Sequence, residues 1–244
     1  MDRQMETRTR IIRANGRCRW PHALVQGLFG FFVVANLAGC QIIIGTLLTL
    51  QGRPMTVCDF TSMTKKKLTE KGKKVIVLSS STAVAQSEEP SLDLDVIAEV
   101  SRRLKIEKVN VVDPHKVTNW IDDHGGITDE TALAPIGVKF AADYIVLFKF
   151  DNFGYREENS PSLYRGHASY KVVVVEMVDA KSAPDGKRAK IIYNKPFESK
   201  YPANQPISAE QVGSPDLFKT QYLGRLSQEL GRLFIDYRIE DEMI

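Results

Sequence analysis

A folded domain begins at residues 74–78, which read KVIVL. A continuous apolar run of this length is typical of a strand that is buried on both faces, as strands of parallel sheets are. The polar run Ser79-Ser80-Ser81-Thr82 follows it and predicts a turn. The pattern therefore favours an α/β domain with an early parallel crossover.

Two amphipathic helices with recognisable start signals follow this strand. Ser91 or Asp93 can cap the first helix, whose apolar residues recur at helical spacing as far as Leu104. Asp113 and Pro114 supply a cap and a first-turn proline for the second helix. Each helix would present one apolar face to the sheet.

The rest of the chain completes a mixed sheet. The polar turn at 179–186 separates two long strand-like stretches, so these should pair as an antiparallel hairpin. The expected fold class is α/β: a mixed sheet with a parallel βαβ start and a late antiparallel hairpin, helices packed on it, and a C-terminal helix. The expected strands after the first are 109–112, 144–150, 164–178 and 190–201, with a helical stretch at 128–140 and a last helix opening at Ser214 and Pro215.

The first 39 residues have the character of a secretory leader. Six arginines precede residue 20, and from Ala23 the chain is mostly apolar as far as Ala38. A charged region followed by an apolar one is typical of a signal peptide. Because the arginines stay on the cytoplasmic side of the membrane, we expect the domain outside the cytoplasm.

The apolar run ends in Leu37-Ala38-Gly39-Cys40, which resembles the lipobox of bacterial lipoproteins. The resemblance implies cleavage between Gly39 and Cys40, diacylglycerol on the Cys40 sulfur, and usually acylation of the new amino terminus. Several acyl chains anchor a protein firmly, since each buried CH₂ contributes roughly 0.8 kcal/mol. Residue 41 is Gln rather than Asp, which by resemblance to diderm sorting signals favours the outer membrane over the inner one.

An uncleaved signal anchor is the alternative interpretation of this segment. Apolar character continues beyond Cys40 to Leu50. Residues 23–50 are therefore long enough to span a hydrocarbon core, which needs about 20 residues. Both interpretations place the domain outside the cytoplasm.

Charge and cysteine usage exclude two further classes of protein. Of 33 Lys/Arg and 30 Asp/Glu, six and two lie before Cys40, which leaves 27 and 28. The basic excess belongs to the leader, so we expect no nucleic-acid partner. Cys18, Cys40 and Cys58 are the only cysteines, and their number and spacing exclude a disulfide framework.

Candidate ligand residues lie where the first strand ends. Open α/β sheets often bind ligands at such a position, so Ser79, Ser80, Ser81 and Thr82, together with His124, form a candidate crevice. The alternative for His124 is a helix end at which the imidazole meets the negative pole of the dipole. The chain has no metal-ligand spacing and no recognisable catalytic motif, so we expect no metal, no cofactor and no enzyme activity.

A lysine-rich segment connects the leader to the domain. Lys65, Lys66 and Lys67 are candidates for contact with anionic headgroups at the membrane surface, and a solvated tether or exposed helical turn is the alternative. The expected organisation is a signal peptide at 1–39, a lipidated N-terminus and tether at 40–73, a single α/β domain at 74–237 and a tail at 238–244.

Three stretches of the domain together resemble one protein family. They are the strand at 74–78, GVKFAADYIV at 137–146, and YRGHA at 164–168 with the long strand after it. Their order resembles the curli-secretion channel lipoprotein family and the related N-terminal domain of the Tol-system propeller protein. The resemblance implies a periplasmic lipoprotein domain that works by assembly with other proteins.

The channel of that family is not expected here. Membrane-spanning hairpins need strands of roughly 9–11 residues with alternating apolar and polar positions. The polar loops expected at 151–163 and 179–189 cannot supply them.

The predicted function is that of a membrane-anchored envelope lipoprotein without a pore of its own. It would act in assembly, transport or scaffolding through protein–protein contacts. The expected partners are membrane lipid through Cys40, envelope proteins and further copies of the chain. The alternative is a periplasmic ligand-binding or enzymatic domain that uses the crevice at the carboxyl ends of the first strands.

Overall fold

The fold was analysed in a computed structural model of the chain, which describes residues 55–125, 133–157, 159–181 and 186–238. The chain divides into two units, Met1–Pro54 and Met55–Ile244. The first unit lies outside the described residues, and with it lie the candidate cleavage and lipidation residues Gly39 and Cys40.

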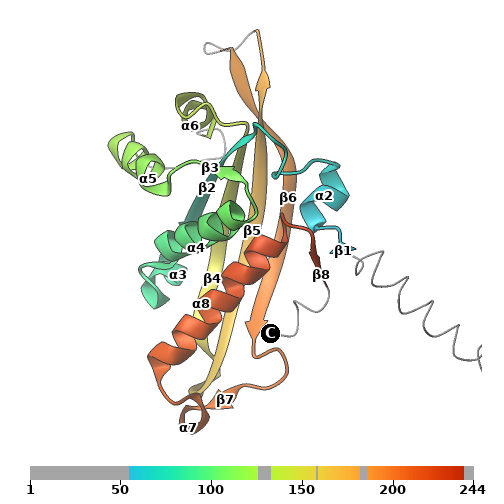
Figure 1. The fold of residues 1–244 in the computed structure, drawn as a ribbon. Coiled ribbons are helices and arrows are strands. Elements are labelled where there is room, and N and C mark those ends of the chain that lie inside the picture. Colours follow the sequence, from blue (N-terminus) through green and yellow to red (C-terminus); the bar gives the residue numbers. More distant parts are fainter. Residues whose placement is uncertain (1–54, 126–132, 158, 182–185, 239–244) are drawn as a thin grey trace, which may run out of the picture. The chain divides into compact units, whose positions relative to one another are not determined.

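The unit contains both helices and strands, with the early strands separated by helices and the later strands consecutive (Figure 1). In chain order they are β1 (Met55–Thr56), α2 (Asp59–Thr64), β2 (Lys74–Ser81), α3 (Ala83–Glu88), α4 (Leu92–Ile106), β3 (Asn110–Val111), α5 (Pro114–Asp123), α6 (Leu133–Lys139), β4 (Tyr144–Glu157), β5 (Ser160–Asp179), β6 (Lys187–Tyr201), β7 (Ile207–Ser208), α7 (Ala209–Val212), α8 (Pro215–Arg232) and β8 (Tyr237–Arg238).

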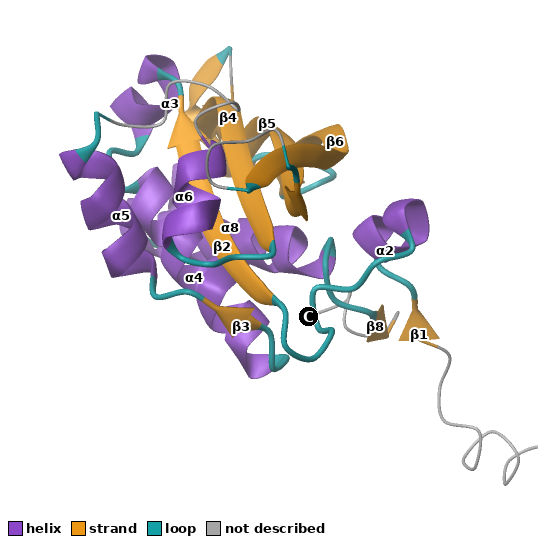
Figure 2. Ribbon diagram, turned by 90° about the horizontal axis from the view of Figure 1, so that it is seen from above, coloured by secondary structure: helices purple, strands orange, loops and turns teal. Residues whose placement is uncertain are grey.

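The main sheet has the strand order β3-β2-β4-β5-β6, and β7 pairs with β5. β2 runs parallel to both β3 and β4, whereas β4, β5 and β6 are successively antiparallel. The expected fold class, with its parallel start and late antiparallel hairpin, is confirmed. The helices cover this sheet on both sides, as seen from above in Figure 2.

Two apolar cores lie on opposite faces of the sheet because neighbouring strand residues point to opposite faces. Val75 and Val77 of β2 face one core, and Ile76 and Leu78 face the other. The first core is closed by α2, α3, α4 and α8, and the second by α5 and α6. Burial on both faces explains why β2 reads as an unbroken apolar run.

Local start signals place the helices where the sequence predicts them. The Asp113 side chain accepts a hydrogen bond from the His115 amide at 3.1 Å, with Pro114 in the first turn of α5. Ser214 caps α8 in the same way, accepting from the Leu217 amide at 3.1 Å. The caps satisfy backbone N–H groups that have no partner within the helix.

The hairpin between β4 and β5 differs from the sequence prediction. A polar loop is expected at 151–163, but β4 continues to Glu157 and β5 starts at Ser160. Register shifts follow Phe150 and Gly154, and Phe153 and Tyr155 are buried in the first core. Bulges interrupt the alternation of apolar and polar residues, which hides the strand from a period-two pattern.

The compact unit also begins earlier than the expected domain start at Lys74. Phe60 of α2 and Leu68 are both 0% exposed. The Phe60 amide donates to the Leu233 carbonyl at 3.0 Å, and β1 pairs with β8 near the other end of the unit. The part of the expected tether from Cys58 to Leu68 is therefore packed against the rest of the unit.

Candidate functional site

The polar run after β2 is engaged with a helix rather than open to ligand. Asp93, in the first turn of α4, accepts a hydrogen bond from the Ser79 hydroxyl and another from the Ser81 hydroxyl, both at 2.6 Å. The Ser81 amide also lies 3.2 Å from Asp93 Oδ2. Asp93 therefore joins the end of β2 to the start of α4, and it occupies two of the hydroxyls in the candidate crevice.

Thr82 and Ser80 lie on either side of this junction. Thr82 is the N-cap of α3 and accepts from the Ala85 amide at 3.4 Å, while its hydroxyl donates to the Asp151 carbonyl at 2.9 Å. Ser80 faces away from Asp93, beside Lys149 of the neighbouring strand. The four residues therefore do not converge on one point.

His124 contacts its own helix. It is the C-cap of α5, its ring stacks on Trp120 with centroids 4.0 Å apart, and its Nδ1 lies 2.7 Å from the Trp120 carbonyl oxygen. Figures 1 and 2 both show α5 apart from α3, which starts directly after Thr82. None of the contacts described for His124 joins it to the serine run. The ligand crevice therefore stays a prediction, because its residues do not come together in the described part of the structure.

Two of the three candidate membrane-contact lysines have carboxylate partners within the domain. Lys66 forms an ion pair with Glu176 of β5, and Lys67 Nζ lies 2.8 Å from Asp236 Oδ2. The hydrogen bond from Lys67 holds the pKa of the Asp236 carboxyl below its usual value. Lys65 lies exposed at the end of α2 in a left-handed conformation, and its ammonium donates to the Ser62 carbonyl.

A second polar cluster fastens α2 to the sheet. Asp59 accepts hydrogen bonds from Lys195 Nζ, at 2.8 Å, and from the Tyr193 hydroxyl, both on β6. Burial opposes ionisation of Asp59, yet these two donors hold its pKa below the usual value. Nearby, burial raises the pKa of the Cys58 thiol, which favours its protonated form.

The hollows of the described surface are shallow and of mixed polarity. One of about 560 Å³ lies between α2 and α8 and includes Asp59, Arg225 and Glu229. Another, of about 360 Å³, follows the bulged part of β4 and includes Glu88 and His167. Within the described ranges, no group of three His, Cys, Asp or Glu side chains has the arrangement of a metal site.

Apolar side chains are exposed at the end of the domain where α4 and α8 begin. Val84 of α3, Leu94 of α4 and Leu217 of α8 are 63%, 59% and 51% exposed. Glu89 and Lys219, 3.7 Å apart, join the end of α3 to the first turns of α8. Their exposure does not follow from the sequence pattern, because an apolar residue in a helix is normally expected on its buried face.

Comparison with known proteins gives structural likeness only. No protein-family model and no curated protein sequence matches the chain. Similar solved structures include lipoprotein GNA1162 from Neisseria meningitidis, with 13% identity, a TM-score of 0.39, and coverage of 65% of this chain and 98% of that one. The PelC dodecamer from Paraburkholderia phytofirmans has 9% identity, a TM-score of 0.38, and coverage of 75% and 98%. The LpoB C-terminal domain from Salmonella enterica has 11% identity, a TM-score of 0.32, and coverage of 58% and 98%.

The membrane prediction rests on the leader alone. Among the residues that the structure describes, no helix is long and apolar enough to cross a bilayer. The resemblance to the curli-secretion family stays a prediction from the three stretches quoted above.

Proposed function

We propose that the chain is a membrane-anchored lipoprotein of the cell envelope that acts in assembly, transport or scaffolding through protein–protein contacts, without catalysis or a pore of its own. The observation that carries the proposal is the sequence Leu37-Ala38-Gly39-Cys40 at the end of an apolar run that follows six arginines. An acylated Cys40 would anchor the mature chain in the membrane.

The folded unit supports a role in protein contact. Val84, Leu94 and Leu217 expose apolar side chains on three helices at one end of the domain. Exposed apolar side chains at one end of a domain are candidates for a protein contact, whereas scattered single ones are common on any surface. In the candidate crevice, the hydroxyls of Ser79 and Ser81 already donate to Asp93. Fewer polar groups are therefore available there to bind a small ligand.

The anchor is tested by intact mass of the protein expressed in a diderm host, with and without globomycin. We expect a mature species that starts at acylated Cys40, and accumulation of the precursor when the inhibitor is present. A Cys40→Ala variant is the control and should stay unprocessed. A full-length, unacylated product from the wild-type chain would contradict the lipoprotein assignment.

The protein contact is tested by crosslinking in the same host. Val84→Asp and Leu217→Asp should abolish specific crosslinks to envelope proteins, because a buried carboxylate without a partner opposes association. Ile106→Asp is the matched control, since Ile106 is 62% exposed at the opposite end of α4. Crosslinks that survive the first two substitutions would exclude this end of the domain as the contact.

A further inference from the structure

One end of the main sheet gathers basic side chains from segments far apart in the sequence. β2 begins, β5 ends and β6 begins at this end, since β2 and β4 are parallel and the later strands antiparallel. Lys66 binds Glu176 of β5, Lys73 Nζ lies 3.2 Å from Asp143 Oδ1, and Lys74 Nζ donates to the carbonyl that follows α6. We call the following set the basic end: Lys65, Lys66, Lys67, Lys71, Lys73, Lys74, Lys139, Lys181, Lys187, Arg188 and Lys190.

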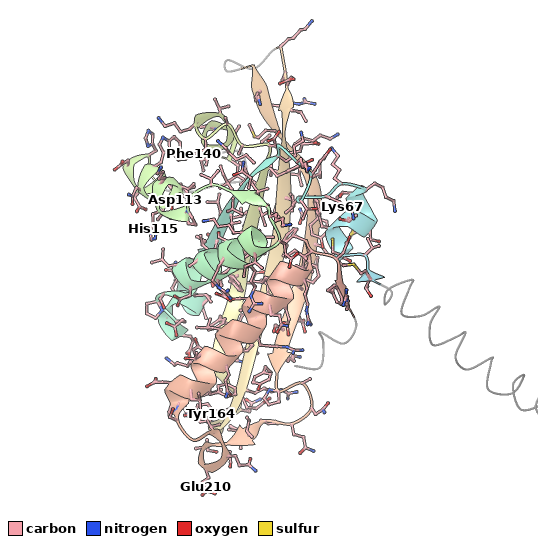
Figure 3. All side chains as sticks on the ribbon, viewed as in Figure 1. Lys67, Asp113, His115, Phe140, Tyr164 and Glu210 are labelled. Atoms are coloured by element: carbon pink, nitrogen blue, oxygen red, sulfur yellow. The ribbon has the colours of Figure 1, made fainter. Side chains whose placement is uncertain are left out.

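Carboxylates neutralise only part of this set. The chain segments that supply the basic end also contain four described carboxylates, and Asp236 lies beside Lys67 as a fifth. These five carboxylates face eleven Lys and Arg side chains; they are Glu70, Asp143, Glu176, Asp179 and Asp236. Outside these two groups the described residues include 15 Lys and Arg side chains and 16 Asp and Glu side chains, so the rest of the folded unit is close to neutral. The excess of positive charge is therefore concentrated at one end of the described domain, and Figure 3 shows Lys67 toward the basic end and Glu210 at the far end.

The hairpin of β5 and β6 projects from the basic end. β4 begins at Tyr144, opposite Glu176, so the residues of β5 beyond this point have no neighbour in β4 (Figure 1). On the partner strand, Lys190 pairs with Glu176 in register and Arg188 with Val178. Arg188 and Lys190 are exposed, and within the described residues neither has an ion-pair partner.

These contacts change which lysines are available to an outside partner. Lys66, Lys67 and Lys73 are engaged with carboxylates, although the sequence places them in the most obvious basic cluster. Among the described residues, the exposed charge without such partners comes from Lys65 and Lys71 and, outside that cluster, from Lys139 at the end of α6 and from the β5–β6 hairpin. A sequence window cannot bring these two regions together, since strand pairing does so.

We propose that the basic end contacts the anionic headgroups of the membrane surface, with the β5–β6 hairpin as its foremost part, and that this contact orients the domain. The inference rests on the membrane anchorage of the proposed function. Residues 41–54 separate Cys40 from the folded unit, and a chain of this length reaches up to roughly 50 Å when extended. That reach is long enough for either end of the domain to meet the membrane, so charge decides between them.

Because the electrostatic potential of the membrane has a short range, it favours orientations in which the basic end lies at the membrane surface. The potential of an anionic surface falls off within a Debye length, about 8 Å at physiological ionic strength. A domain with its excess of positive charge at one end therefore gains most when that end is near the headgroups. Lys187 and Arg188 come closest in that orientation, since they pair with Asp179 and Val178 beyond the start of β4, with Lys139 at the end of a helix beside the sheet.

Amine footprinting of the full-length protein reconstituted in vesicles tests this orientation. Lysines are acylated with a soluble reagent and quantified by mass spectrometry in phosphatidylcholine vesicles and in vesicles that also contain phosphatidylglycerol. Labelling of Lys139, Lys187 and Lys190 should fall about threefold or more in the anionic vesicles and recover in about 1 M NaCl. Lys200, at the other end of β6 and 58% exposed, is the internal reference and should not change.

Two double variants with the same change in net charge distinguish a specific orientation of the domain from a general attraction of the protein to anionic lipid. Arg188→Glu/Lys190→Glu should remove the protection of Lys139 and Lys187, whereas Lys200→Glu/Lys219→Glu should leave it intact. Protection that ignores lipid charge, or that is equal at both ends, would overturn the proposal. The N-terminal peptide from the same digests reports whether Cys40 is acylated, so failure of the anchor is distinguished from failure of the orientation.

Discussion

At the residue scale, Asp93 is the side chain that holds the end of β2 in place through hydrogen bonds. Sequence pattern presents it as one of two candidate caps for α4, yet its carboxylate accepts from Ser79 and Ser81 instead of from its own helix. Hydrogen bonds to a charged acceptor are stronger than those between neutral groups. The serine run is thus ordered by a residue that stands more than ten positions later in the chain.

Replacing Asp93 tests this role. Asp93→Ala should lower the free energy of unfolding by about 1–3 kcal/mol, because it leaves two half-buried hydroxyls without their acceptor. Asp95→Ala is the control, since Asp95 is exposed and accepts only from Ser91 among the described contacts. Urea denaturation measures both. Equal effects of the two substitutions would mean that the Asp93 contacts contribute nothing beyond a surface hydrogen bond.

At the element scale, the long strand β5 and the helix α8 fit together through a glycine. A Cβ built on Gly166 would lie 2.3 Å from the Tyr222 ring, and Tyr222 is 0% exposed. The same ring packs against Phe153 with centroids 5.6 Å apart. The bulged extension of β4 therefore belongs to the core because α8 crosses it at this point.

Two glycine substitutions give opposite expectations at this contact. Gly166→Ala should destabilise the domain by about 1–3 kcal/mol, because an extra methyl in a packed core forces side chains out of place. Gly224→Ala in the middle of α8 should stabilise it by about 0.5–1 kcal/mol, since no atom lies within 4 Å of the new Cβ and alanine favours the helix. Thermal unfolding followed by circular dichroism distinguishes them. A neutral Gly166→Ala would show that Tyr222 relaxes freely.

At the scale of the whole molecule, the first and the last described segments of the folded unit pack against each other. β1 pairs with β8, the Cys58 amide donates to Asp236 at 3.1 Å, and Phe60 packs against Phe234 with centroids 5.7 Å apart. The segment from Cys58 to Leu68 is thus part of the first core.

The contribution of this segment is tested by truncating two side chains of α2. Phe60→Ala should cost about 3–5 kcal/mol, because it removes a fully buried ring from the core. Met63→Ala, at 59% exposure on the same helix, should change stability by no more than about 0.5 kcal/mol. Chemical denaturation compares the two variants. If Phe60→Ala were as mild as Met63→Ala, α2 would be dispensable to the fold.

The sequence by itself determined the long strands and the main helices, although not the short elements β1, α2, α3, β7, α7 and β8. Asp113-Pro114 and Ser214-Pro215 are local signals, so they predict α5 and α8 without any knowledge of the tertiary structure. The unbroken apolar run of β2 likewise predicts a strand that is covered on both faces.

Only the tertiary structure decided the rest, because the deciding contacts join residues distant in the chain. The extension of β4 past Phe150 is stabilised by α8, and the inclusion of α2 by β6 and the chain end. The basic end exists only because strand pairing brings the β5–β6 hairpin beside α6 and the lysines before β2. A sequence window of a few residues contains local propensity and periodicity, but the partners that bury a bulged strand or neutralise a lysine lie outside it.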